Sequence, residues 1–215
     1  MIYSLGGRLQ TADFADKVAS AELLTDLQHE FSNAVSATCV LCLLHAHAGH
    51  EETGIFPSMQ TIDPTLIRGL LDDHVEIRRR LTIITQRAEE LRAIDAPAER
   101  LERGADINRE VNAFFAFYLA HMNKEEITIA PAMKEHFTDP QLGAMQGAMM
   151  AAMPPDRLAS YLRWMLPSLS LGELTGMLTG LKHGAPPEFL RIVDGIGAAQ
   201  VDPARWALVR ERVGI

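Results

Sequence analysis

Two short segments of the sequence share one pattern of histidine and glutamate. HAHAGHEETGIFP (residues 45–57) and HMNKEEITIAP (residues 121–131) both contain H-x-x-x-E-E-x-x-I-x-P. Imidazole nitrogens and carboxylate oxygens are common ligands of iron, manganese and zinc. The repeat therefore indicates a metal site. Its matched positions are His47, Glu51, Glu52, Ile55 and Pro57 in the first copy, and His121, Glu125, Glu126, Ile129 and Pro131 in the second.

The four-residue spacing places each histidine and the first glutamate after it on one face of a helix. The same face is apolar further back in both copies, with Val40 and Leu44 before His47, and Phe114 and Tyr118 before His121. We therefore expect Glu51 and Glu125 to point into a helical core. A buried carboxylate is costly unless it meets a cation, a proton or a strong partner.

A third helix brings another candidate ligand, His74, which lies on an apolar face between Leu70 and Ile77. Imidazole and carboxylate groups that converge from facing helices are typical of metal sites inside bundles. A single histidine on an apolar face is more often an ordinary core residue, so the repeat is what favours a ligand here. We expect the other polar residues at the surface or around the site: His29, His45, His50, His136, His183, Glu52 and Glu126.

Helix-period stripes of apolar residues predict an all-α protein, because no stretch alternates like a strand. They place helices over residues 23–44, 67–84 and 111–122, with a weaker helix within residues 3–21. The segment IDAPAERLERG (residues 94–104) is expected to be a connection. We predict an up-down four-helix bundle over residues 1–137.

Residues 138–215 differ from the preceding part in that their predicted helices are short, and they predict a small C-terminal helical subdomain. Short helices follow start signals such as Asp139-Pro140, Ser170 with Glu173, and Asp202-Pro203. Their apolar faces could cover the bundle or a second subunit, which leaves room for a homodimer.

Charge and hydropathy argue against nucleic acid and membranes as partners. The formal net charge is −8, and no basic stripe suited to nucleic acid is present. No apolar stretch reaches the length of a membrane span, so we expect no membrane association and a cytoplasmic location.

Cys39 and Cys42 lie in an apolar run without a second pair, and we interpret them as core residues. No catalytic residues are recognisable: neither a nucleophile–histidine arrangement nor a phosphate-binding glycine loop occurs.

The chain resembles the hemerythrin-like (HHE cation-binding) family in the two repeated segments and in DDHVEIRRRL (residues 72–81). The tail resembles the helical extension of some bacterial members. The resemblance implies a four-helix bundle with a non-haem di-iron centre. By position it implies ligands from the second helix (His47, Glu51), the third (His74) and the fourth (His121, Glu125), with the two glutamates able to bridge two metal ions.

Two positions depart from the family pattern. Leu5 stands about where a first-helix histidine is expected, and Arg78 stands where the third helix often has a second histidine. The loss of neutral ligands should weaken or remove one of two metal ions. Alternatively, the Arg78 guanidinium could pair with Glu51 or Glu125 and replace metal charge with a salt bridge.

Three functions are compatible with this sequence. The leading hypothesis is a non-enzymatic domain that binds iron, mononuclear or dinuclear, and uses it to bind or sense O2, NO or peroxide. Zinc and manganese are alternative metals. The second is a di-iron oxidase or peroxidase, or an iron donor for repair of iron–sulfur clusters. The third is a metal-free helical interaction module.

Overall fold

The computed structural model describes residues 2–31 and 40–215, and in these ranges all regular structure is helical. The predicted all-α architecture, a bundle followed by small helices, is confirmed. The chain forms two compact units, Met1–Met149 and Met150–Ile215, which are described separately below. None of the described helices is long and apolar enough to cross a membrane.

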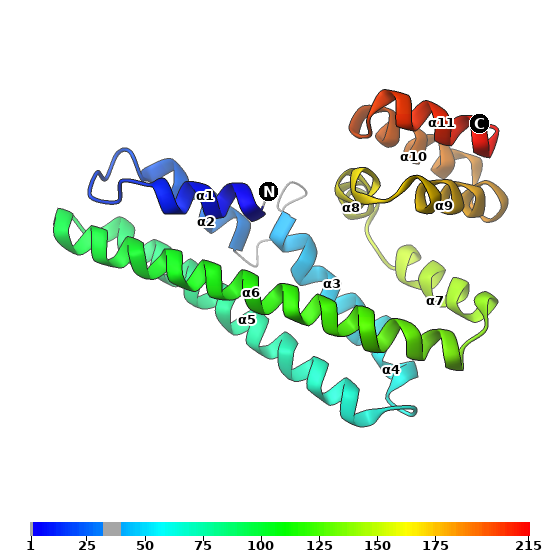
Figure 1. Cartoon of the computed structure of the whole chain (residues 1–215), viewed down its shortest axis with the longest axis horizontal. Coiled ribbons are helices and arrows are strands. Elements are labelled where there is room, and N and C mark those ends of the chain that lie inside the picture. Colours follow the sequence, from blue (N-terminus) through cyan, green and yellow to red (C-terminus); the bar gives the residue numbers. More distant parts are fainter. Residues whose placement is uncertain (1, 32–39) are drawn as a thin grey trace. The chain divides into compact units, whose positions relative to one another are not determined.

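The first unit is organised around two long antiparallel helices (Figure 1): α5 (Pro64–Ala93) and α6 (Pro97–His136). Each begins with a proline, which suits the first turn because a helix needs no N–H donor there. The Asp63 carboxylate caps α5 by accepting hydrogen bonds from the backbone N–H groups of Thr65 and Leu66. The prediction that residues 94–104 form a connection is wrong, because the connection is shorter. Only residues 94–96 link the two helices, because Pro97 starts α6 and the first turn is then held by a buried side chain, Arg100.

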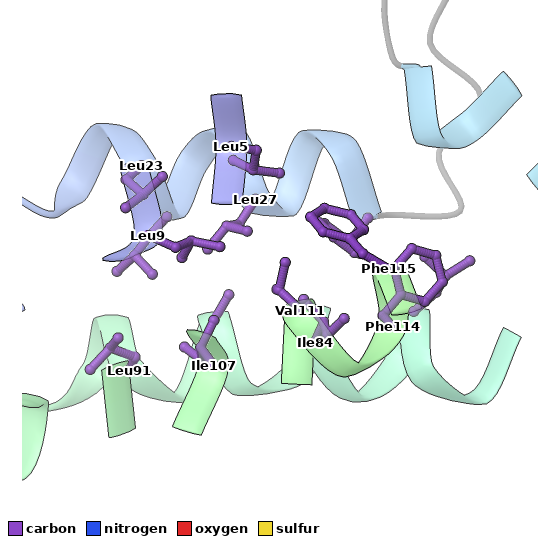
Figure 2. Packing of buried hydrophobic residues seen from close by; sticks show 14 of the residues in the cluster. Leu5, Leu9, Leu23, Leu27, Ile84, Leu91, Ile107, Val111, Phe114 and Phe115 are labelled. Atoms are coloured by element: carbon purple, nitrogen blue, oxygen red, sulfur yellow. The ribbon is translucent and has the colours of Figure 1, made fainter. Parts of the chain in front are cut away.

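Two shorter helices pack on one half of this pair: α1 (Ile2–Thr11) contacts α6, and α2 (Ala21–Phe31) contacts α5. Figure 2 shows leucines of α1 and α2 facing the apolar residues of α5 and α6 across the core. The core of this half includes Leu5, Leu9, Leu23, Leu27, Ile84, Leu91, Ile107, Val111, Phe114 and Phe115. Leu5 is therefore a packing residue.

The other half of the pair is covered by α3 (Val40–Gly54) and a single turn, α4 (Phe56–Met59). The helix expected over residues 23–44 corresponds to α2 and the start of α3. Residues 32–39, which include Cys39, lie outside the described residues, as do the side chains of residues 40–45. Phe56 and Met59 pack with Ile67, Leu70 and Ile129 in a second small core. This half carries the histidine and glutamate repeat.

The second unit follows α7 (Asp139–Ala151) and consists of α8 (Pro155–Ser168), α9 (Leu171–Gly184), α10 (Pro187–Gln200) and α11 (Pro203–Val213). The predicted start signals act as caps: Ser170 and Glu173 form a capping box, and Asp202 caps α11. The unit has its own core of nine buried residues: Leu162, Leu166, Leu174, Leu178, Val193, Val201, Trp206, Val209 and Val213.

Candidate metal centre

Four of the predicted ligands meet in the half of the bundle covered by α3. Glu51 comes from α3, His74 from α5, and His121 and Glu125 from α6. One possible ligand atom from each residue lies within 4.8 Å of all the others, and all four side chains are buried. Three helices therefore deliver two imidazoles and two carboxylates to one small volume.

The inner atoms of this cluster are close together. His74 Nε2 lies 3.1 Å from His121 Nε2 and 3.4 Å from Glu51 Oε2. His121 Nε2 lies 3.0 Å from Glu125 Oε1, one helical turn further along α6. Two buried carboxylate oxygens, Glu51 Oε2 and Glu125 Oε1, face these imidazole nitrogens, and among the described residues no other donor reaches them.

The outer nitrogen of His74 is held by a carboxylate outside the cluster. His74 Nδ1 lies 2.9 Å from Glu52 Oε1, and the same oxygen accepts a hydrogen bond from Arg78 Nη1 at 2.8 Å. Glu52 thus has a defined place beside the site. Arg78 pairs with Glu52, and in the described part of the chain no salt bridge joins it to Glu51 or Glu125.

His121 is held in a similar way by Asp73, the residue before His74. His121 Nδ1 lies 3.4 Å from Asp73 Oδ2, which also accepts a hydrogen bond from Lys124 Nζ at 2.8 Å. Each histidine therefore faces a carboxylate that is in turn bound to a cationic side chain. Sequence reasoning missed Asp73 and Lys124, because their meeting depends on the register between α5 and α6.

These outer contacts set the chemistry of the inner atoms. A carboxylate only accepts hydrogen bonds, so each histidine presents its proton on Nδ1 and a lone pair on Nε2. Two Nε2 lone pairs and two carboxylate oxygens then face one another in a buried space. Such a set of acceptors requires a cation or a proton between them. The residues present therefore fit a metal ion, and the outer carboxylates orient the histidines as is usual at metal sites.

Without a metal ion, a proton satisfies the cluster. Burial lowers the pKa of His74, but hydrogen bonds to Glu125, Glu51 and Glu52 outweigh it and raise the pKa to about 9. Burial raises the pKa of Glu51, and hydrogen bonds from His47 and His74 outweigh this and lower it to about 2. The metal-free centre therefore favours a protonated His74 imidazole beside an ionised Glu51 carboxylate.

His47, the fifth predicted ligand, lies at the edge of the cluster and outside the group of four. Its Nε2 is 3.1 Å from Glu51 Oε1, and its side chain is 34% exposed. Burial lowers the pKa of His47, but the hydrogen bond to Glu51 and the charges of Glu51 and Glu125 raise it overall. His47 therefore binds the outer oxygen of Glu51 and leaves the inner oxygen facing His74.

The second glutamate of the later copy and two other histidines face solvent. Glu126 is exposed, as are His136 and His183. The second glutamates of the two copies thus differ: Glu52 is half-buried against His74, whereas Glu126 faces solvent.

Aromatic rings enclose the two central histidines. The Phe56 ring stacks on His74 with ring centroids 5.4 Å apart, and the Tyr118 ring meets His121 at 6.2 Å. These apolar walls limit the entry of water, which strengthens the interaction of the cluster with any ion it holds.

Comparison with protein families identifies the chain. Residues 8–145 match the model of the hemerythrin HHE cation-binding domain, which is more than half of the protein. The chain belongs to this family, and its buried histidine–glutamate cluster lies in the matched region. Searches of curated proteins and of solved structures found no match.

Proposed function

We propose that the first unit binds a single non-haem iron ion and uses it to bind or sense a small ligand such as O2, NO or peroxide. The observation that carries this proposal is the convergence of four buried side chains, two of them carboxylates whose inner oxygens meet no donor among the described residues except the histidines of the cluster. The ligands in this proposal are Glu51, His74, His121 and Glu125. Iron held by them would supply open coordination positions for a small molecule.

The donor set supports iron. Two histidines with carboxylates and open positions are typical of non-haem ferrous sites, whereas structural zinc sites have a closed tetrahedral shell. Manganese accepts the same ligand types, so the metal must be measured directly.

The positions around the cluster support one ion instead of two. Helix α5 contributes one imidazole, that of His74. The residue one turn later is Arg78, whose guanidinium is bound to Glu52. Leu5 adds no ligand, because it is packed in the apolar core of the other half. Among the described side chains that contact the four clustered residues, His47 is the one further imidazole available to a second ion.

Each residue around the proposed site has a separate role. Glu52 and Asp73 hold the Nδ1 protons of His74 and His121, which fixes both Nε2 lone pairs inward. His47 holds the outer oxygen of Glu51. Phe56 shields the His74 ring from water by stacking on it.

The test is metal content after anaerobic loading with Fe(II) and removal of free metal. We expect one iron ion per wild-type chain, and less than about 0.2 per chain for Glu125→Ala, because a buried ligand is lost. The matched control is Glu126→Ala, which removes the neighbouring exposed carboxylate of the same motif and should keep full loading. Equal loading of both variants would contradict the proposed ligand set.

Ligand binding requires a second measurement on the loaded protein. We expect a reversible change in the optical or EPR spectrum when NO is added, and none in Glu125→Ala. Steady consumption of peroxide by the wild-type protein would instead favour an oxidase or peroxidase. An iron-free wild-type protein after loading would favour the interaction module.

A further inference from the structure

A second polar feature lies in the half of the bundle formed by α1 and α2. A cavity of about 200 Å³ adjoins the start of α2 and the end of α5, and it is lined by Lys17, Ala21, Leu24, Thr25, Arg92 and Arg100. Half of the lining residues are cationic and none is acidic. The protein as a whole is acidic, with a formal net charge of −8, so this local excess of positive charge is unusual for the chain.

Arg92 leaves one donor without an acceptor. Its Nη2 donates a hydrogen bond to Thr25 Oγ1 at 2.8 Å, but its Nε is shielded from solvent and has no hydrogen-bond partner. A buried N–H group without an acceptor destabilises the protein. An oxyanion in the cavity would supply this acceptor once a turn of the Arg92 side chain exposed Nε.

Arg100 adds a fully buried positive charge. Its guanidinium donates to the backbone carbonyl oxygens of Phe14, Leu91 and Ile94, and to Ser20 Oγ. Among the described residues no carboxylate forms a salt bridge with it. Hydrogen bonds lower the pKa values of the Asp16 and Asp95 carboxyls, and the charge of Arg100 helps to lower them; it would stabilise an anion in the cavity in the same way.

Two acidic residues near the cavity, Asp16 and Asp95, already accept hydrogen bonds. Asp16 accepts hydrogen bonds from the backbone N–H groups of Val18 and Ala19, and Asp95 accepts one from Lys17. The start of α2 at Ala21 adds the partial positive charge of a helix N-terminus.

Another cavity of similar size provides an internal comparison. It measures about 190 Å³ and is lined by Arg87, Glu90, Arg103 and Asp106, so two carboxylates balance its two arginines. A polar groove between these helices does not by itself require an excess of cations.

We propose that the cavity lined by Lys17, Arg92 and Arg100 is a binding site for a small oxyanion of phosphate chemistry, separate from the metal centre. Arg92 would bind the anion after its side chain turns to expose Nε, and Lys17 Nζ would exchange Asp95 for an oxygen of the anion. The charge of Arg100 would stabilise the anion further. The volume suits inorganic phosphate or the phosphate group of a small metabolite.

The test is calorimetric titration of the full-length protein with inorganic phosphate at constant ionic strength. We expect a dissociation constant of about 1 mM. Arg92→Gln should weaken binding by about tenfold or more, because it removes a charge-assisted hydrogen bond. Arg87→Gln removes an arginine charge from the other cavity, and it should leave the dissociation constant for phosphate unchanged within about twofold.

Three results would overturn the proposal: no heat of binding up to about 20 mM phosphate, equal affinities of the wild type and Arg92→Gln, or equal losses in both arginine variants. Lys17→Gln, at a half-exposed position, replaces Arg92→Gln if the latter fails to fold. Glu125→Ala should retain Arg92-dependent binding, which separates this site from phosphate bound at the metal. Tighter binding of glycerol phosphate than of inorganic phosphate would identify a phosphate ester as the preferred ligand.

Discussion

Replacement of Glu52 by glutamine tests the role of the outer carboxylates. Glu52 accepts hydrogen bonds from His74 Nδ1 at 2.9 Å and from Arg78 Nη1 at 2.8 Å, and it is not one of the four clustered residues. Glutamine keeps the size of the side chain but removes its negative charge. His74 Nδ1 then loses its charged acceptor and lies near an Arg78 cation that no longer has a counter-charge.

The expected loss in metal affinity follows from the contacts. Removal of a carboxylate that orients a metal-binding histidine typically weakens metal binding by about 10–100-fold. This corresponds to about 1.4–2.7 kcal/mol, since each factor of ten is about 1.4 kcal/mol. We expect the upper half of this range, because Glu52 also neutralises a guanidinium that would otherwise repel the metal ion.

The assay is anaerobic competition for Fe(II) between the protein and a chromophoric chelator. Glu126→Gln is the control, because it makes the same change at the matching position of the repeat, where the glutamate is exposed. It should bind Fe(II) within about twofold of the wild type. An affinity of Glu52→Gln within that range, or equal losses in both variants, would show that Glu52 does not support the metal-binding histidine.

Two further predictions concern stability. Gly104→Ala should destabilise the first unit by about 1–3 kcal/mol in urea unfolding, because an added Cβ would overlap the Phe14 ring. Gly7→Ala, in open space on α1, should instead be neutral or stabilising, and a neutral Gly104→Ala would show that this half is loosely packed. The metal-free protein should be most stable between the ordinary pKa values of Glu51 and His74, 4.5 and 6.5. The lowered pKa of Glu51 contributes stability that is lost as pH falls toward 2, and the raised pKa of His74 contributes stability that is lost as pH rises toward 9. Melting temperatures across this range check the prediction, and a maximum above pH 9 would contradict it.

The inner part of the metal centre was predictable because it depends on local spacing. Residues four apart share a helix face whatever the rest of the fold does, so His121 and Glu125 could be assigned to one inward face. The apolar residues before them determine that the face is buried. The same reasoning placed His47 with Glu51, yet His47 lies at the half-exposed edge, because periodicity gives the direction of a side chain and not its depth in the core.

The outer part of the centre could not be predicted in this way. Asp73 and Lys124 meet across α5 and α6, and their contact depends on how far one helix is shifted along the other. Glu52 and Glu126 occupy equivalent positions of the repeat, but only Glu52 has a histidine of another helix beside it. Contacts between helices, which single-helix periodicity does not describe, decide these roles.

Arg100 shows a similar limit at the other end of the bundle. Its segment is polar and contains Pro97, which indicated a connection. In the structure Pro97 occupies the first turn of α6, and Arg100 is fully buried because the carbonyl groups at the end of α5 accept its hydrogen bonds. A charged residue at a helix start is usually exposed, so only the packing of α6 against the end of α5 and the segment between α1 and α2 reveals this role.

The most direct test of the metal centre is an anomalous difference map, recorded at the iron absorption edge, from crystals of the Fe(II)-loaded protein. We expect one peak per chain within bonding distance of Glu51, His74, His121 and Glu125, with Arg78 still bound to Glu52. Two peaks bridged by Glu51 and Glu125 would contradict the single-ion site. An empty cluster, with Arg78 turned onto either glutamate, would contradict metal binding itself.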